Sequence, residues 1–358
     1  MSSMKNSKSF KRNLGLIAFM NSGGLGIQTK RLAHMLKPER IMVINSSGFS
    51  PNKDQHPEWY QNYNFFTCNG FPNDEQVKKF LQNLTHVFTV ENPYNFNLVW
   101  YGQQQGTKIY CQSNYEFCDN LNKPYLPVPD LFLMPSYWKL DEMRAQFGES
   151  VVKYLPPPID PDEFAVARKI NLKRTGKPRF LHIIGTLASY DRNGTLDLLS
   201  SLKCTYADFE LVIHTQHPIP MEYFLDDKRV TYRIENKLLN ADLYKDFDAL
   251  LLPRRYGGLS LTTNEALMAG LPVFMTDISP NNRLLPKEWL FDSIYKSSFI
   301  GRSKIETYSA RKIQMATKID WLVKQDFSKL KEQAFELGMK NFSEDVLKPQ
   351  YAPLFKGV

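Results

Sequence analysis

Short apolar runs alternate with longer amphipathic and polar stretches along the whole chain of 358 residues. Short apolar runs between polar stretches are typical of buried strands, and their alternation with helical stretches predicts parallel α/β sheets. In the first half the predicted strands are Leu14–Met20, Arg40–Asn45, His86–Val90, Lys108–Gln112 and Leu131–Met134. In the second half they are Arg179–Ile184, Glu210–His214, Val230–Ile234, Ala249–Leu252 and Pro272–Met275. The pattern therefore predicts an α/β protein with two sheets.

A proline cluster, Pro156-Pro-Pro158, separates the two series of strands. Three consecutive prolines stiffen the chain, and the polar, basic segment Lys169–Pro178 follows, so we expect the domain boundary near residues 158–172. We predict an N-terminal domain over residues 1–165 and a C-terminal domain over residues 166–342. An amphipathic helix is expected over Asp326–Asn341, and the tail 343–358 is expected to pack back onto the first domain. Tandem α/β domains commonly bind their ligand between them, which favours two Rossmann-like domains facing across a cleft.

The formal charge of +8 favours a polyanionic partner, whether nucleic acid, anionic lipid or a phosphorylated ligand. The first acidic residue is Glu39, and basic residues precede it at Lys5, Lys8, Lys11, Arg12, Lys30, Arg31 and Lys37. A solvated basic tail is the alternative interpretation of this asymmetry.

The chain has four cysteines, Cys68, Cys111, Cys118 and Cys204, without a C-x-x-C pair or histidines at zinc spacing. We therefore expect a reducing compartment. The apolar run Leu14–Met20 is too short for a membrane span and lacks the cleavage site of a signal peptide. These features predict a cytoplasmic protein without transmembrane association, a monomer or a homodimer.

A glycine-rich segment, Asn21-Ser-Gly-Gly-Leu-Gly26, follows the first predicted strand and precedes a helical stretch over Ile27–Leu36. Glycines at such a junction let the backbone approach an anion, and the free N–H groups of the helix point at it. Gly23 and Gly24 are therefore candidates for phosphate binding. The dinucleotide fingerprint fails, because its third glycine is replaced by Thr29 and no acidic residue ends the second strand. A tight strand-to-helix turn without a ligand is the alternative.

The densest cluster of candidate chemistry is the segment Leu252–Val273, in which a strand ends at a proline before Arg254, Arg255 and two glycines. A helix with one carboxylate, Glu265, follows. Arginines and open backbone amides can neutralise a diphosphate without a metal, and a carboxylate can accept two vicinal ribose hydroxyls. The alternative is that the arginines are surface charges and that Glu265 only favours its helix through the dipole.

This cluster resembles the GT-B glycosyltransferases of the large family 4 ("group 1") class. The resemblance lies in Glu265-Ala-Leu-Met-Ala-Gly-Leu-Pro-Val273, which contains the second glutamate of that family's E-x7-E pair; the first falls on Gly257. Met134-Pro-Ser-Tyr-Trp138 and Tyr154–Phe164 also resemble family motifs. The segment Gly185–Gly194 stands where relatives carry a basic loop, and Arg192 is the candidate to replace its lysine.

The resemblance implies transfer of a sugar from a nucleotide diphosphate, expected to be a UDP-sugar, to a hydroxyl with retention of configuration. The implied donor-binding residues are Gly23, Gly24, Arg192, Arg254, Arg255, Gly257, Gly258, Leu259, Ser260 and Glu265. Arg192 and Arg254 would stabilise the leaving diphosphate, so we expect a reaction that needs no metal or other cofactor. Glu91, at the end of a first-domain strand, is a candidate catalytic base, and a helix-capping or loop role is the alternative.

The candidate residues for binding the acceptor are aromatic and basic. The segment Ser50–Phe66 reads as an aromatic-rich loop, and Lys11, Arg12, Trp59, Tyr60 and Tyr94 are candidates to bind the acceptor. Rings between cations suit stacking on bases and contacts to phosphates, although the same rings can simply pack the first domain.

The segment Pro253–Glu265 is similar to a phage-associated branch whose members glycosylate hydroxymethylated pyrimidines in DNA, which implies a location in the cytoplasm of an infected host. DNA with a modified base, such as 5-hydroxymethylcytosine, is therefore the leading acceptor hypothesis. A transferase for cell-envelope polysaccharide or lipid at a membrane surface is an alternative. A catalytically inactive GT-B module that only binds DNA or a nucleotide is another, because Gly257 breaks the glutamate pair.

Overall fold

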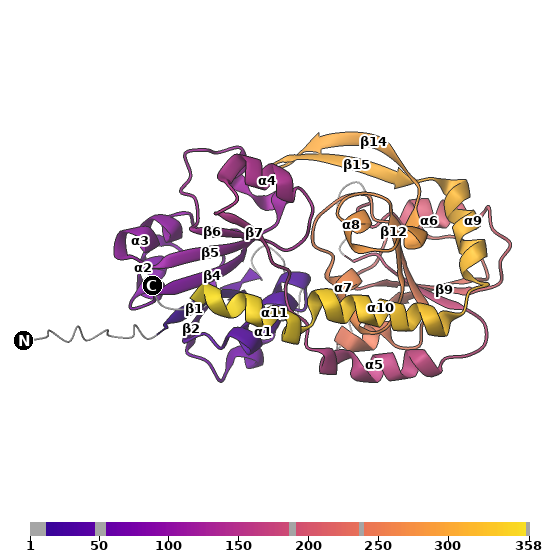
Figure 1. Ribbon diagram of the computed structural model, residues 1–358, viewed down its shortest axis with the longest axis horizontal. Helices are drawn as coiled ribbons and strands as arrows, with labels where there is room; N and C mark the ends of the chain where they lie inside the picture. The colour runs from indigo at the N-terminus through magenta and orange to yellow at the C-terminus, as the bar shows by residue number, and fades with distance from the viewer. Residues whose placement is uncertain (1–11, 47–54, 186–190, 236–239, 356–358) are drawn as a thin grey trace, which may run out of the picture. The chain divides into compact units, whose positions relative to one another are not determined.

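The computed structural model describes residues 12–46, 55–185, 191–235 and 240–355 (Figure 1). They divide into two compact units. The first unit comprises the chain up to Pro135, Leu140–Pro158 and the segment from Leu347 on, and the second comprises Ser136–Lys139 and Ile159–Val346. None of the helices in these described ranges is long and apolar enough to cross a membrane.

The first unit is built on a seven-stranded sheet in the order β3-β2-β1-β4-β5-β6-β7. Its strands, all parallel to their neighbours, are β1 Leu14–Phe19, β2 Arg40–Asn45, β3 Phe65–Asn69, β4 His86–Glu91, β5 Lys108–Ser113, β6 Leu131–Met134 and β7 Val152–Tyr154. Strands β2 and β3 lie on one side of β1 in the sheet, and β4 to β7 lie on the other. The carboxyl ends of β1 and β4, where the strand order switches, are therefore the expected place for a ligand.

Helices of the first unit connect the strands, as parallel pairing requires. They are α1 Gly24–Leu36, α2 Asp74–Leu81, α3 Asn97–Gln105 and α4 Leu140–Phe147. Two separate apolar clusters include residues of this unit's sheet. One of them contains Leu347 and Tyr351 from the C-terminal helix α11, Glu344–Tyr351, and Phe355 beyond it. The Tyr351 hydroxyl donates to the Pro156 carbonyl at 2.9 Å and accepts from the Gln112 amide at 2.8 Å, which fixes this late segment in the first unit.

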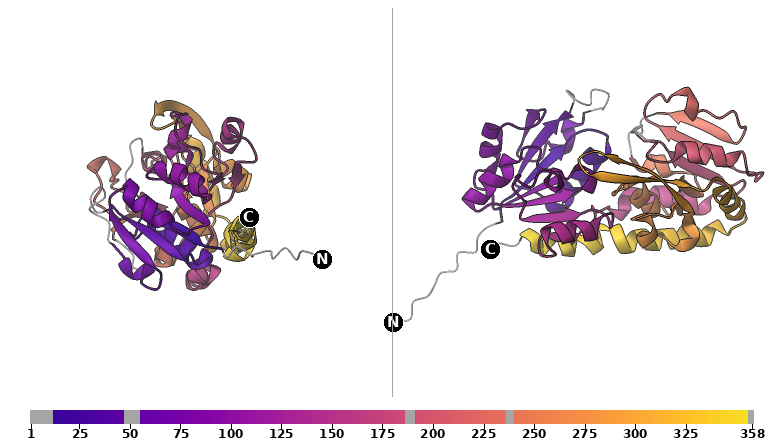
Figure 2. Two further views of the ribbon diagram at one scale, coloured as in Figure 1. Left: turned by 90° about the vertical axis from the view of Figure 1, so that its left-hand side faces the viewer. Right: turned by 90° about the horizontal axis from the view of Figure 1, so that it is seen from above.

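The second unit has a parallel six-stranded sheet in the order β10-β9-β8-β11-β12-β13. Its strands are β8 Arg179–Ile183, β9 Glu210–Thr215, β10 Val230–Ile234, β11 Ala249–Leu252, β12 Val273–Thr276 and β13 Leu290–Phe291. A separate antiparallel hairpin is formed by β14 Ser293–Ile300 and β15 Lys304–Ala310 (Figure 2). The order β10-β9-β8-β11 again makes β8 and β11 neighbours, so the loops that follow these two strands start side by side.

The helices of the second unit are α5 Pro161–Lys173, α6 Thr195–Leu202, α7 Leu261–Met268, α8 Asn281–Leu284, α9 Lys312–Leu322 and α10 Phe327–Phe342. Helix α7 is almost wholly buried, and α10 crosses it at Gly338. A Cβ at Gly338 would lie 2.9 Å from the Leu267 carbonyl carbon, so only glycine permits this approach. The close crossing fixes the helix that carries Glu265.

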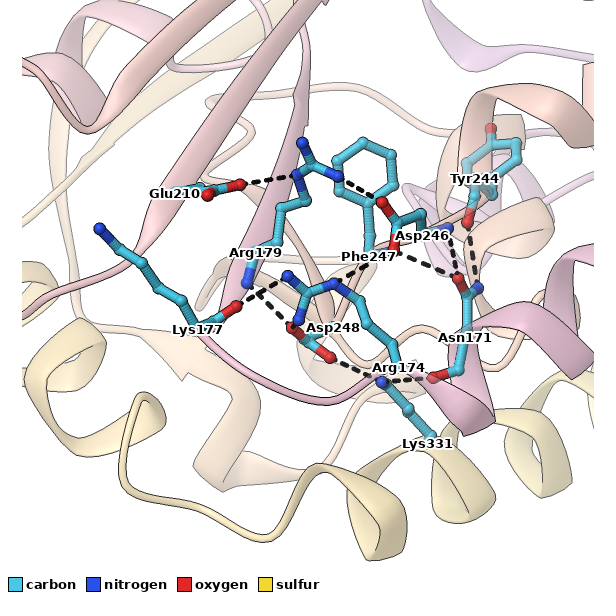
Figure 3. A network of polar contacts seen from close by, with 10 residues as sticks. All are labelled: Asn171, Arg174, Lys177, Arg179, Glu210, Tyr244, Asp246, Phe247, Asp248 and Lys331. Atoms are coloured by element: carbon cyan, nitrogen blue, oxygen red, sulfur yellow. Dashed lines mark hydrogen bonds and ion pairs between the residues drawn. The ribbon is translucent and has the colours of Figure 1, made fainter.

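A polar network joins α5, α10 and the amino ends of the strands (Figure 3). At its centre is Asp248, buried directly before β11. One carboxylate oxygen accepts from the Lys331 ammonium at 2.6 Å, and the other accepts from the Arg174 guanidinium at 2.5 Å and from the Arg179 amide at 2.9 Å. Lys331 is also buried and donates to the Asn171 carbonyl at 2.7 Å. These buried charges are thus compensated by partners within the same unit.

The ten predicted strands are all present, and the predicted α/β architecture with two parallel sheets is confirmed. The sequence did not predict β3, β7, β13 or the hairpin β14–β15. The three missed sheet strands lie at sheet edges or are two or three residues long, and β14 is mostly exposed, so none produces a buried apolar run.

Two segments that were expected at the domain boundary or in a loop contain regular secondary structure. The segment Lys169–Pro178 begins inside helix α5, which starts where Asp160 accepts a hydrogen bond from the Asp162 amide and Pro161 stands at the first helical position. The predicted boundary at residue 165 also falls inside this helix. In the predicted aromatic loop Ser50–Phe66, residues 57–60 form a 3-10 helix and β3 begins at Phe65, while residues 50–54 lie outside the described ranges.

Candidate active site

Two loops of the second unit meet at the carboxyl edge of its sheet. One follows β8 and is described from Asp191 on; the other follows β11 and begins at Pro253. They touch at Gly194, where an added Cβ would lie 2.0 Å from the Pro253 carbonyl oxygen. Gly194 also has a φ of +70°, a conformation that glycine adopts without strain. This approach brings Arg192 on one loop next to Arg254 on the other.

The side chains of Arg192 and Arg254 converge on Gly257. A Cβ at Gly257 would lie 2.4 Å from a terminal nitrogen of Arg192 and 2.8 Å from a terminal nitrogen of Arg254. The Arg254 guanidinium is buried and donates to the carbonyls of Tyr256 at 3.0 Å and Leu259 at 3.1 Å. Two cations are therefore held against one main-chain turn, where the φ of Gly257 is +109°.

Arg192 is also positioned by an aromatic ring. Its guanidinium lies 5.2 Å from the centroid of Tyr256, within the range of a cation–π contact. Tyr256 in turn makes an edge contact with Phe299 of β14, with ring centroids 5.4 Å apart. A continuous set of contacts thus runs from the hairpin to the arginine pair.

Arg255 is used differently from Arg254. Its amide donates to the Arg192 carbonyl at 2.8 Å, its carbonyl accepts from the Tyr308 amide at 3.0 Å, and its guanidinium donates to the Tyr308 carbonyl at 3.0 Å. Arg255 therefore attaches strand β15 to the loop. Burial raises the pKa of the nearby Asp197 carboxyl, an effect that Arg255 and a hydrogen bond from Ser309 partly offset.

The loop from β8 is fixed to helix α6 by Asp191. Its carboxylate accepts from the Thr195 amide at 3.0 Å and the Leu196 amide at 2.8 Å. The carboxylate satisfies free N–H groups at the start of α6, and its charge suits the positive end of the helix dipole. Arg192 follows this capping residue directly.

Glu265 lies in the middle of α7 and is buried. One of its carboxylate oxygens accepts from the Tyr244 hydroxyl at 2.6 Å. The Asn171 side-chain amide donates at 3.0 Å to the carbonyls of Tyr244 and of Ala269, the C-cap residue of α7 (Figure 3 shows the first of these bonds). The Glu265 carboxyl group is thus buried, and the Tyr244 hydroxyl is oriented on it.

The remaining predicted donor residues form the turn into α7. Leu259 contributes the carbonyl that holds Arg254, and Ser260 occupies the N-cap position of α7. The Ser260 hydroxyl bonds with the side chains of Thr262 and Thr263 at 3.0 and 2.9 Å. Gly258 lies between these groups and Gly257. The structure therefore brings Arg192, Arg254 and residues 257–260 together in one loop cluster.

In the first unit, Gly23 and Gly24 lie where α1 begins, at the carboxyl end of β1. The Gly23 amide donates to the Asn21 side chain at 2.9 Å. A Cβ at Gly26 would lie 1.8 Å from the Asn21 carbonyl oxygen, so Gly26 is required by the turn itself. Gly26 therefore has a structural role that is independent of any ligand.

The segment after β4 is conformationally unusual. Glu91 and Tyr94 have φ values of +68° and +61°, which are uncommon for residues with side chains. The Asn92 side chain accepts from the Tyr94 amide at 2.7 Å, and Tyr94 packs edge-on against Phe19 of β1, with centroids 5.2 Å apart. Residues held in this backbone region occur preferentially at functional sites.

The predicted acceptor residues do not form one surface. Tyr60 is fully buried, and its hydroxyl donates to the Phe19 carbonyl at 2.8 Å. Its assignment as an acceptor ligand is therefore wrong. Arg12 precedes β1 and lies over the Phe355 ring at 5.6 Å, at the opposite edge of the sheet from Gly23. Lys11 lies outside the described residues.

Trp59 remains as an accessible aromatic group. It is partly exposed, stacks on His56 with centroids 4.6 Å apart and an interplanar angle of 9°, and has the Lys30 ammonium 4.9 Å from its centroid. His56 is close to the carboxyl end of β1, since its amide donates to the Met20 carbonyl at 2.5 Å. This ring stack is therefore near the same edge as the glycine loop.

Sequence reasoning missed Tyr244, Phe299 and Tyr308. Tyr244 precedes Glu265 by 21 positions, and no local pattern links the two. Phe299 and Tyr308 belong to the hairpin, which no apolar run indicated. Tyr256 stands inside the arginine–glycine segment, and its position between Arg255 and Gly257 was the available signal for its role.

The fold is found in known enzymes. A glycosyltransferase from Rickettsia africae superposes with a TM-score of 0.69 and 14% identity, covering 97% of this chain and 98% of that one. Sucrose-phosphate synthase from Thermosynechococcus elongatus matches with a TM-score of 0.66 and 12% identity over 96% of this chain and 98% of that one. Anabaena HepE in complex with UDP and glucose matches with 0.66 and 10% identity over 96% and 99%.

No protein-family model and no curated protein matches the sequence. The structural matches span nearly the entire chain, and the two parallel-sheet units are those of the GT-B fold, as the sequence predicted.

Proposed function

We propose that the protein is a retaining glycosyltransferase that uses a nucleotide diphosphate sugar, a UDP-sugar in the first instance. The observation that carries this proposal is the convergence of Arg192 and Arg254 on Gly257, at the carboxyl edge of a sheet in a GT-B chain. Since one fold supports many functions, the fold supplies the class of reaction and the paired cations supply the reason to apply it here.

Arg192 and Arg254 act on the leaving nucleoside diphosphate. As the bond from the anomeric carbon to the diphosphate breaks, negative charge accumulates on the phosphate oxygens, and cations already held in place stabilise that charge. The Tyr256 and Leu259 carbonyls hold the Arg254 fork, and the Tyr256 ring holds Arg192. The backbone amides of Gly258 and Ser260 provide further donors for the sugar or the diphosphate.

Glu265 accepts the ribose hydroxyls, with the Tyr244 hydroxyl fixing the orientation of its carboxylate. Arg255 contributes to the site through the architecture of the loop, since it bonds to the Arg192 carbonyl and to the main chain of Tyr308. Gly23 and Gly24 present the start of α1 to a phosphate, and Glu91 is the base that takes the proton from the acceptor hydroxyl. The reaction proceeds without a divalent metal.

The acceptor is the hydroxyl of a hydroxymethylated pyrimidine in DNA. The formal charge of +8 and the partly exposed stack of Lys30, Trp59 and His56 support this choice. An enzyme that modifies a base in duplex DNA must first extrude it, and aromatic rings accept the extruded base by stacking.

A panel of nucleotide sugars tests the proposal against duplex DNA with 5-hydroxymethylcytosine and the same duplex with cytosine. We expect a mass gain of one sugar on the modified duplex alone, unaffected by EDTA, with the anomeric configuration of the donor retained. Arg254→Ala should lower turnover roughly 10²- to 10³-fold, whereas Arg144→Ala, on helix α4, should leave turnover unchanged.

Arg254→Lys separates charge from geometry, because lysine keeps the cation but lacks the fork that the two carbonyls hold. It should recover only part of the activity. Transfer to a lipid or polysaccharide acceptor but not to DNA would assign the enzyme to the cell envelope. Tight nucleotide binding with neither transfer nor slow donor hydrolysis would contradict the enzymatic proposal and indicate a binding module.

A further inference from the structure

We infer that the β14–β15 hairpin is a DNA-binding arm of the second unit, which contacts the phosphates of a duplex. This inference rests on the proposed DNA acceptor for its choice of partner. The hairpin lies outside the six-stranded sheet (Figure 2). It contacts the arginine–glycine loop through Phe299 and Tyr308.

The two strands differ in their exposure. In β15 the alternate residues Ile305, Thr307 and Ser309 are buried, as in a strand with one packed face. In β14 residues 294–298 are all exposed, although the pleat directs successive side chains to opposite faces. Both faces of β14 are therefore available to a partner.

The hairpin carries an excess of positive charge. Lys296, Arg302 and Lys304 are exposed cations, and Glu306 is the acidic residue between Ser293 and Ala310. Lys296 lies at the irregularity between Tyr295 and Ser297, where the pairing with β15 shifts register. A bulge of this kind bends a strand and redirects the side chain at the extra position. The charge is complementary to a polyanion.

The shape and the apolar residues favour duplex DNA as that polyanion. A two-stranded β-ribbon fits the major groove, which is about 12 Å wide. Ile300, at the end of β14, is 84% exposed, and Tyr295 is 57% exposed. An exposed apolar side chain at the end of a cationic ribbon, such as Ile300, is of the kind that contacts the methyl group of thymine in the major groove.

The hairpin is attached directly to the donor loop. The Arg255 carbonyl accepts a hydrogen bond from the Tyr308 amide, and the Arg255 guanidinium donates to the Tyr308 carbonyl. Phe299 contacts Tyr256, which contacts Arg192. A duplex bound by the hairpin would therefore be held in a defined position relative to the arginine pair.

The test measures binding of a fluorescent duplex by the full chain as a function of salt. Each lost phosphate contact lowers the slope of log K against log salt by about 0.9. The combined variant Lys296→Ala, Arg302→Ala and Lys304→Ala should therefore reduce the magnitude of the slope by about 2 to 3 and weaken binding about 100- to 1,000-fold at 0.1 M salt. Ile300→Ser should weaken binding with little change in slope.

A matched variant controls for net charge. Lys324, Lys329 and Lys340 are exposed on or next to helix α10 of the same unit, and their replacement by alanine removes the same charge. We expect this control to keep the wild-type slope. The thermal unfolding midpoint and the rate of donor hydrolysis of the hairpin variant should equal those of the wild type, which shows that the fold and the donor site are intact.

The outcomes separate the two proposals. If the wild type binds DNA and the hairpin variant keeps its slope, the hairpin assignment is overturned and the proposed function is unaffected. If the slope falls as expected but no sugar reaches the modified base, the hairpin assignment stands and the proposed acceptor chemistry fails. If the wild type does not bind duplex DNA, both the hairpin assignment and the proposed DNA acceptor are overturned.

Discussion

Replacement of Gly257 by alanine tests the arginine pair through its geometry. A Cβ at this position would lie 2.4 Å from a terminal nitrogen of Arg192 and 2.8 Å from one of Arg254, both well inside van der Waals contact. The clashing atoms are the ends of flexible side chains, so the least costly response is displacement of the guanidinium groups. The proposed diphosphate site should therefore be disrupted while the fold is retained.

The substitution is expected to have two separate effects, one on stability and one on kcat. The φ of +109° strains any residue with a Cβ, which costs about 1–3 kcal/mol and lowers the melting temperature by several degrees. Displacing a preorganised cation from the leaving group lowers kcat by about 10²- to 10³-fold. Transfer kinetics and differential scanning calorimetry measure the two effects separately.

Gly176→Ala is the matched control. Its φ is +94°, and an added Cβ meets nothing within 4 Å, so it introduces the backbone strain without moving an arginine. We expect a similar loss of stability and wild-type kcat. If Gly257→Ala and Gly176→Ala reduce activity equally, or if Gly257→Ala is fully active, the arginine pair does not act on the leaving group.

Two further predictions concern the buried groups of the fold. Lys331→Met leaves the Asp248 carboxylate buried without its ammonium partner and should lower the free energy of unfolding by about 3–5 kcal/mol, measured with urea. Lys329→Met, at an exposed position of the same helix, should change it by less than about 0.5 kcal/mol, and equal effects would contradict the assigned burial. Burial raises the pKa of both the Cys68 and the Cys118 thiol to about 11, so little reactive thiolate forms at pH 8. Iodoacetamide should therefore modify the partly exposed Cys204 at least about 100-fold faster than Cys68, as mapped by mass spectrometry, and comparable rates at the two residues would refute the prediction.

Much of the fold was predictable because buried strands of parallel sheets are continuous apolar runs, as in Leu250-Leu-Leu252 of β11. The strands that were missed leave no such run. Gly257 and the arginines were identified from the Leu252–Val273 segment, since residues close in sequence converge there. The role of Arg255 was not predictable, because its partner Tyr308 belongs to a strand 53 positions away. Tyr60 was misassigned because an aromatic residue among polar neighbours gives no indication of which rings face the core.

The contribution of Leu347, Tyr351 and Phe355 to the first unit's apolar cluster has a consequence for biosynthesis. These residues leave the ribosome only after the second unit has been synthesised, whereas most of the unit they complete has been made long before. Contacts between segments so far apart in sequence form slowly, and a partly made core exposes apolar surface in the meantime. Nascent chains arrested before residue 347 should therefore present an unfinished first sheet to chaperones, while the second unit already contains nearly all its own packing partners.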